Sequence, residues 1–239
     1  MSLLLKLLNK GGSYMQLIKK SLVALLLGLI SMSGFASLTM PENGKEYQVL
    51  AQPQPTDAGG KIEVTEFFFY SCPHCNVLDP FITEWVKKQG NAIVFRRVPV
   101  DFGQGQKPLQ RLFYTLEAMG KLEEMHARIF HAIHVEHLFL RTDQDMVAFV
   151  VKNGIDKARY LETSQSFSIE TKMRKAGTLQ QNYKIDGVPT LFVDGRFMTS
   201  PSTVMGLNPG MSEVDGAKSA LQVMDALVLK AQKDHGSRK

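Results

Sequence analysis

The length, composition and charge of this chain fit one folded domain and exclude a nucleic-acid-binding class. Its 239 residues are 44% hydrophobic, which is enough to bury a sizeable core as one domain, or as one domain with an insertion. The formal charge is +5, but residues 1–36 contain four lysines and no acid, so residues 37–239 carry 24 basic and 23 acidic residues, a net charge of +1. A nucleic-acid partner therefore loses its main support.

The first 36 residues have the layout of an export signal. Two lysines precede an apolar run at residues 22–30, and small residues lead up to Ala36. The run is too short to span a bilayer comfortably, so we expect residues 1–36 to be a signal peptide that is cleaved after Ala36. This layout is present whether translation starts at Met1 or at Met15. An uncleaved amphipathic anchor is the alternative.

An aromatic run that ends in two cysteines is the most informative stretch. Residues 62–69 combine β-branched and aromatic side chains, which predicts a buried strand. Pro73 suits the first turn of a helix, because it lacks the amide hydrogen that would be orphaned there, and Cys72 is then the N-cap. A sulfur at an N-cap faces free backbone N–H groups and the positive end of the helix dipole, which favour a thiolate. His74 would favour it further, and Cys75 can reach back to close a short disulfide.

These two cysteines are the only ones in the chain, and three less reactive roles compete with a redox role. A structural zinc site needs four ligands, and there is no second cysteine pair. A c-type haem attachment needs His directly after the second cysteine, where Asn76 stands. A structural disulfide stays open, although a two-residue spacer closes almost no loop. The agreement of strand, helix start and sulfur pair favours a redox-active dithiol.

Strand and helix patterns alternate along the rest of the chain. Residues 40–60 suggest an extended surface segment with a strand-like piece at 47–50. The helix that begins at Pro73 should run to about Lys88, with a kink at Pro80. The remaining predicted elements are a strand at 92–98, helices throughout 106–183, a hairpin of strands at 190–193 and 196–199, and a last helix at about 215–232 that covers one face of the sheet.

Two sets of polar residues in these elements need separate treatment. Glu66 lies inside the apolar strand, where a carboxylate is costly unless it is paired or protonated; an exposed position is the alternative. Four histidines fall in the helical segment, and no nearby carboxylate or cysteine pattern completes a metal site with them. We therefore expect no metal, and expect these histidines to be solvated or at helix ends. They are His126, His131, His134 and His137.

Three segments together resemble the DsbA-like thiol:disulfide oxidoreductases of the bacterial periplasm. They are Cys72-Pro73-His74-Cys75, the preceding Glu66-Phe67-Phe68, and the later Gly187–Gly195. The Pro-His pair between the cysteines is the most specific part. The resemblance implies an α/β protein with the thioredoxin fold and an inserted helical domain, in which residues 37–105 and 171–239 form the thioredoxin part and residues 106–170 the insertion.

The same resemblance implies roles for individual residues. Cys72 would be the exposed nucleophile and Cys75 the resolving cysteine, with Pro73 and His74 tuning the pair. The Val188–Pro189 bond would be cis and face the cysteines, which leaves the backbone before the proline to bind substrate. Glu66 would lie beneath the cysteines and tune them or assist proton transfer. The basic residue that accompanies this acid in the family aligns with Arg97, which can pair with a carboxylate but cannot release a proton. Asn76 stands where relatives often have an aromatic residue.

The implied function is that of a monomeric, periplasmic dithiol oxidase without a cofactor. It would donate the Cys72–Cys75 disulfide to newly exported proteins with reduced cysteines, and a quinone-linked membrane protein of the DsbB type would reoxidise it. A disulfide isomerase or reductase is the nearest alternative. A non-catalytic exported binding protein with a structural disulfide is the alternative from another class.

Overall fold

The computed structural model describes residues 40–103 and 105–237. The predicted signal peptide, its cleavage after Ala36 and the two alternative starts lie outside these residues. Among the helices in the described ranges, none combines the length and the hydrophobicity that crossing a membrane requires.

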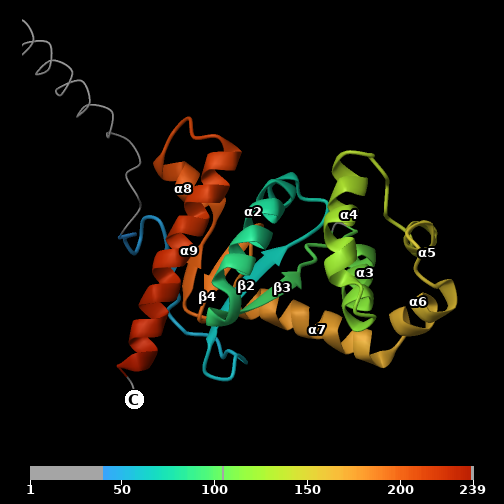
Figure 1. Cartoon of the computed structure of the whole chain (residues 1–239), viewed down its shortest axis with the longest axis horizontal. Helices are drawn as coiled ribbons and strands as arrows, with labels where there is room; N and C mark the ends of the chain where they lie inside the picture. The colour runs from blue at the N-terminus through green and yellow to red at the C-terminus, as the bar shows by residue number, and fades with distance from the viewer. Residues whose placement is uncertain (1–39, 104, 238–239) are drawn as a thin grey trace, which may run out of the picture. The chain divides into compact units, whose positions relative to one another are not determined.

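A mixed sheet with the strand order β1-β5-β4-β2-β3 forms the centre of the fold (Figure 1). Strand β2 (Ile62–Phe68) is buried along its whole length; it pairs parallel with β3 (Ile93–Pro99) and antiparallel with β4 (Thr190–Val193). Strand β5 (Phe197–Thr199) joins β4 to the short β1 (Gln48–Val49), with both pairings antiparallel. The predicted strands are confirmed, with ends that differ by at most one residue.

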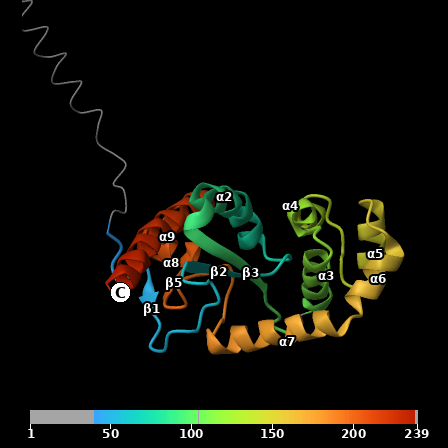
Figure 2. The ribbon, with the colours of Figure 1, turned by 60° about the horizontal axis from the view of Figure 1, so that its bottom comes forward.

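Helices cover both faces of this sheet (Figure 2). On one face, α2 (Pro73–Gln89) and α9 (Glu213–Gly236) share a hydrophobic cluster with Val64 and other residues of β2 and β4. On the other face lies α7 (Phe167–Asn182). Because side chains alternate along a strand, Glu66 on β2 points to the face that α2 covers.

The predicted helical segment between β3 and β4 is confirmed. Its elements are α3 (Lys107–Ala118), α4 (Leu122–His134), α5 (Asp143–Lys152), α6 (Lys157–Ser164) and α7, and the first four gather beside the sheet (Figure 1). The predicted domain boundaries at residues 105 and 170 stay predictions; the second falls inside α7.

Two helices need comment. Helix α2 continues through Pro80, and a short 3₁₀ turn, η1 (Gly90–Ala92), follows it; the kink at Pro80 stays a prediction. Helix α9 is longer at both ends than predicted; it begins earlier because Ser212 caps it by accepting a hydrogen bond from the backbone of Asp215 at 3.1 Å. The short helix α8 (Pro201–Leu207) packs against α9.

Candidate active site

The two cysteines lie where β2 gives way to α2. Cys72 is the N-cap of α2, with φ −82° and ψ 119°, and its Sγ accepts a hydrogen bond from the backbone N–H of Cys75 at 3.4 Å. Pro73 occupies the first turn, as predicted. The local sequence therefore places the first sulfur against the free N–H groups of the helix start.

The expected exposure of Cys72 is wrong. Only 4% of the residue is exposed, compared with 0% for Cys75, although its neighbours Ser71 and Pro73 are exposed. The reason is a loop more than a hundred residues away in the chain: the carbonyl oxygen of Val188 lies 3.6 Å from the Sγ of Cys72. The Val188–Pro189 peptide bond is cis, as the family resemblance implied.

The two thiols have opposite protonation behaviour. A hydrogen bond from the Cys75 thiol, backbone N–H groups of Cys75 and His74, and the charge of His74 together lower the pKa of Cys72 to about 6, against the opposing effect of burial. Burial raises the pKa of Cys75, and its interactions with Cys72 raise it further. At neutral pH the reduced pair is therefore a thiolate at Cys72 and a thiol at Cys75.

A buried ionic network lies between β2, β3 and α2. Arg97 donates from Nε to Oε2 of Glu66 at 3.0 Å and from Nη2 to Oδ1 of Asp79 at 3.2 Å. Burial raises the pKa of Glu66 to about 7, with the charge of Arg97 opposing and that of Asp79 adding to the rise. The alternative of an exposed Glu66 is wrong, because only 2% of this residue is exposed.

His126 also belongs to this network, so its expected place in solvent or at a helix end is wrong. It is 5% exposed; Nε2 lies 3.2 Å from Oδ1 of Asp79, and Nδ1 lies 2.7 Å from the hydroxyl oxygen of Tyr70. Within residues 40–103 and 105–237, no three or more His, Cys, Asp and Glu side chains are grouped so that they could hold a metal ion.

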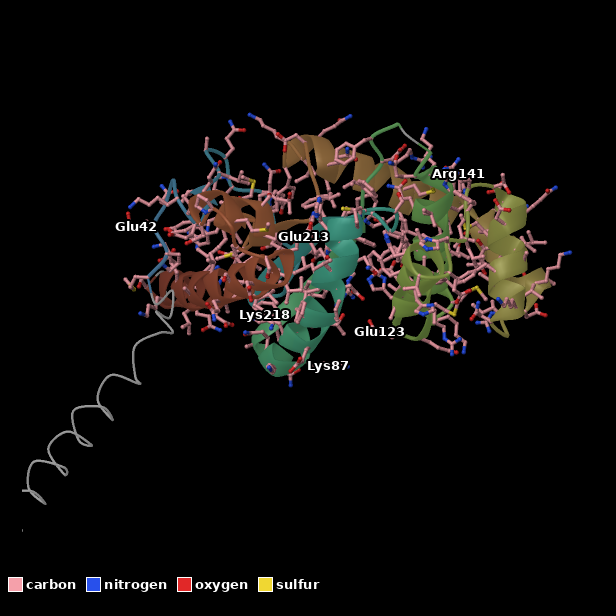
Figure 3. All side chains as sticks on the ribbon, turned by 90° about the horizontal axis from the view of Figure 1, so that it is seen from above. Glu42, Lys87, Glu123, Arg141, Glu213 and Lys218 are labelled. Atoms are coloured by element: carbon pink, nitrogen blue, oxygen red, sulfur yellow. The ribbon has the colours of Figure 1, made fainter. Side chains whose placement is uncertain are left out.

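A cavity of about 370 Å³ lies beside His74, which stands between the two cysteines in the chain. The cis-proline loop, α8 and the start of α9 line it, and its lining is mainly apolar, with Val188, Pro189 and Met205 among the lining residues. At its rim, His74 Nδ1 lies 3.2 Å from Oε1 of Glu213, which Figure 3 places beside the end of α2 that carries the cysteines. The cavity can therefore accept an apolar segment next to the sulfur pair.

Residues 63–222, more than half of the chain, match the DSBA-like thioredoxin domain family. The chain belongs to this family. One relative, the thiol:disulfide interchange protein DsbA of Burkholderia cepacia, is 42% identical over 199 residues, which cover 82% of this chain and 93% of the relative. The crystal structure of Pseudomonas aeruginosa DsbA matches with a TM-score of 0.74 and 36% identity, over 83% of this chain and 97% of that chain.

Membership of the DSBA-like family confirms the predicted fold class and enzyme class: the protein is a thiol:disulfide oxidoreductase with a thioredoxin-like fold. A second solved structure, DsbA from Xylella fastidiosa, matches with a TM-score of 0.70 and 25% identity, over 81% of this chain and 98% of that chain. The roles of individual residues do not follow from these matches and are argued from their geometry.

Sequence reasoning missed Asp79 as a member of the site of this DSBA-like protein. It lies four residues after Cys75, and the positions between Cys75 and Ile82 that α2 buries include Leu78 and Asp79 side by side. A carboxylate on the apolar face of a helix is unusual and could have been noticed in the sequence. Its partner on α4, His126, is not marked by any local pattern.

Replacing His74 by alanine is expected to raise the pKa of Cys72 by less than about one pH unit. The ring's charge favours the thiolate, but the Cys75 thiol and the two backbone donors stay in place. Titration of thiolate absorbance in the ultraviolet measures the change, with His131→Ala, an exposed histidine on α4, as the control. An unchanged titration would remove His74 from the site.

Proposed function

We propose that this protein is a monomeric periplasmic dithiol oxidase that donates its Cys72–Cys75 disulfide to newly exported proteins with reduced cysteines. The observation that carries the proposal is the asymmetry of the two sulfurs, with the pKa of Cys72 lowered to about 6 and that of Cys75 raised. A stabilised thiolate is a good leaving group and stabilises the reduced protein, which makes the disulfide a stronger oxidant.

The reaction we propose has two exchange steps. A substrate thiolate attacks Cys72 Sγ, the Cys72–Cys75 bond breaks, and Cys75 leaves as a thiolate that takes up a proton. A second substrate thiolate then attacks the substrate sulfur of the mixed disulfide, and Cys72 leaves as a thiolate. Two electrons pass from the substrate dithiol to the protein. The lowered pKa of Cys72 favours its departure in the second step, and the raised pKa of Cys75 favours uptake of a proton once the first step has released it.

Glu66 is the candidate source of the proton that Cys75 takes up. Its pKa of about 7 lets it hold or release a proton at neutral pH. The charge of Glu66 also contributes to the raised pKa of Cys75. Arg97 cannot supply this proton, because a guanidinium stays charged. In this proposal Arg97 orients Glu66 and limits how far its pKa rises.

Client chains would bind in the apolar cavity beside the cysteines, against Val188 and Pro189. Unfolded clients expose apolar side chains, which such a surface binds without a fixed sequence. Return of the protein to the disulfide form needs an external two-electron oxidant, and we propose a quinone-linked membrane protein of the DsbB type. No cofactor of the protein's own enters this scheme.

The equilibrium between the purified protein, residues 37–239, and graded glutathione buffers tests the proposal. We expect an equilibrium far more oxidising than that of thioredoxin, because the reduced form carries the stabilised Cys72 thiolate. A thioredoxin-like value would instead support a reductase. A pair that never becomes reduced in this range would support the structural disulfide.

A further inference from the structure

The imidazole of His126 connects the two sides of the cysteine motif. Its Nδ1 lies 2.7 Å from the hydroxyl oxygen of Tyr70, which stands two residues before Cys72. Its Nε2 lies 3.2 Å from Oδ1 of Asp79, which stands four residues after Cys75. One side chain from α4, a helix that packs beside α2 (Figure 1), therefore contacts the chain on both flanks of the motif.

Burial fixes the hydrogen-bonding roles in this bridge. Tyr70 is 1% exposed and His126 5% exposed, and burial lowers the pKa of His126, so that its ring is neutral at pH 7. Asp79 is ionised: burial opposes ionisation, but the hydrogen bond from His126 and the charges around it hold its pKa below the usual value. A carboxylate only accepts, so Nε2 carries the proton and Nδ1 accepts from the hydroxyl of Tyr70.

Helix α4 also holds Tyr70 and the ring by further contacts. Nε2 of His134 lies 2.8 Å from the main-chain oxygen of Tyr70, so α4 contacts both the side chain and the backbone of this residue. Aromatic rings surround the imidazole, with Phe68 and Phe130 at centroid distances of 5.4 Å and 5.3 Å. Tyr70 and the imidazole are thus packed as well as hydrogen-bonded, which restricts their movement.

We propose that His126 is a positioning residue of the redox site, which bridges Tyr70 and Asp79 and thereby favours the reduced form of the cysteine pair. The inference rests on the proposed redox function of Cys72 and Cys75. His126 acts through its two partners and takes no part in the exchange of sulfur bonds.

The bridge acts on the sulfur through the backbone. It fixes the turn before Cys72 relative to the helix after it, which keeps the backbone donors of α2 aimed at the Cys72 thiolate. The hydrogen bond to Asp79 anchors the helix side of the bridge, and the one to Tyr70 anchors the side of the turn. The oxidised form carries no thiolate, so the bridge favours the reduced form.

Three variants of the mature protein test this role at pH 7.5. His126→Phe keeps a ring but removes both hydrogen bonds, and His126→Gln keeps an amide donor for Asp79. His131→Gln changes a histidine on the same helix that is exposed and pairs with Glu136, and it is the matched control. The measured quantity is the constant for reduction of the disulfide by glutathione, together with the unfolding midpoints of both redox forms.

We expect His126→Phe to lower this constant at least fivefold, His126→Gln to stay within twofold of the wild type, and His131→Gln to leave it unchanged. If the constant were unchanged or raised in His126→Phe and both redox forms were destabilised equally, His126 would only contribute to packing, and the proposal would be overturned. A glutamine variant as impaired as the phenylalanine variant would also overturn it, because the donor to Asp79 would then not matter.

Tyr70→Phe keeps the experiment decisive if His126→Phe does not fold. It removes only the hydroxyl that His126 Nδ1 contacts, and we expect it to lower the constant two- to threefold; an unchanged constant would overturn the proposal. Failure of the proposed redox function gives a different result, since the wild-type disulfide itself would then resist reduction across the whole range of buffers.

Discussion

Replacing Cys72 by serine is expected to lower the rate of disulfide transfer at least about 1000-fold while the fold stays intact. The sulfur of Cys72 is the atom that a substrate thiolate would attack, and a hydroxyl cannot replace it in that exchange. The stability of α2 should not fall, because serine is among the preferred N-cap residues. Its oxygen can accept the hydrogen bond that Cys72 Sγ now accepts from the backbone of Cys75.

The measurement is oxidation of a reduced two-cysteine peptide, with glutathione disulfide as the final oxidant and thermal unfolding as the check on folding. Cys75→Ser is the matched control, since it keeps the sulfur that forms the mixed disulfide but lacks Cys75. With a one-cysteine peptide, which has no second thiol to release Cys72, we expect it to accumulate a covalent complex that is visible on a non-reducing gel. A Cys72→Ser protein that still oxidised the peptide would show that the cysteine pair is only a structural link.

The parts of this site that the sequence predicted are those that depend on short stretches of chain. The strand of residues 62–68 and the helix start at Pro73 follow from side-chain type and from the missing amide hydrogen of proline, so Cys72 could be placed as N-cap without knowledge of the fold. The cis-proline loop near the cysteines was expected only because residues 187–195 resemble a known family.

The parts that the sequence did not predict depend on packing between distant elements. Cys72 is buried because Val188, 116 residues further along the chain, lies across its sulfur. His126 is buried because α4 packs beside α2, and nothing in its own neighbourhood distinguishes it from the exposed His131. The sequence showed that Glu66 needs a partner, but the presence of a second carboxylate, Asp79, at the same guanidinium follows only from the crossing of α2 over the sheet.

That shared guanidinium leads to the second large effect: replacing Arg97 by leucine should lower the free energy of unfolding by about 3–5 kcal/mol at pH 7.5. Within the described residues, Arg97 is the only arginine or lysine that forms an ion pair with Glu66 or Asp79, and it pairs with both. Its side chain is 10% exposed. Without it, two buried carboxyl groups lose their cation. Denaturant unfolding at fixed pH measures the loss.

The pH dependence has a definite sign. Burial raises the pKa of Glu66 from an ordinary 4.5 to about 7, so between these values the folded protein holds a proton that the unfolded chain has released. The wild type should therefore lose about 3 kcal/mol of stability from this group as the pH rises from 4.5 to 7. In Arg97→Leu the opposing charge is gone and the pKa of Glu66 rises further, so the fall should continue above pH 7, and more than half of the loss should be recovered at pH 5.

The double variant Glu66→Gln/Arg97→Leu separates charge from packing. Glutamine has nearly the shape of glutamate but no ionised form, so it removes one of the two uncompensated carboxylates. We expect it to restore at least half of the stability that Arg97→Leu loses at pH 7.5 and to flatten the pH profile between 4.5 and 7. If the double variant were as unstable as Arg97→Leu at every pH, the loss would come from the missing side-chain volume, and the network would not be held together by its charges.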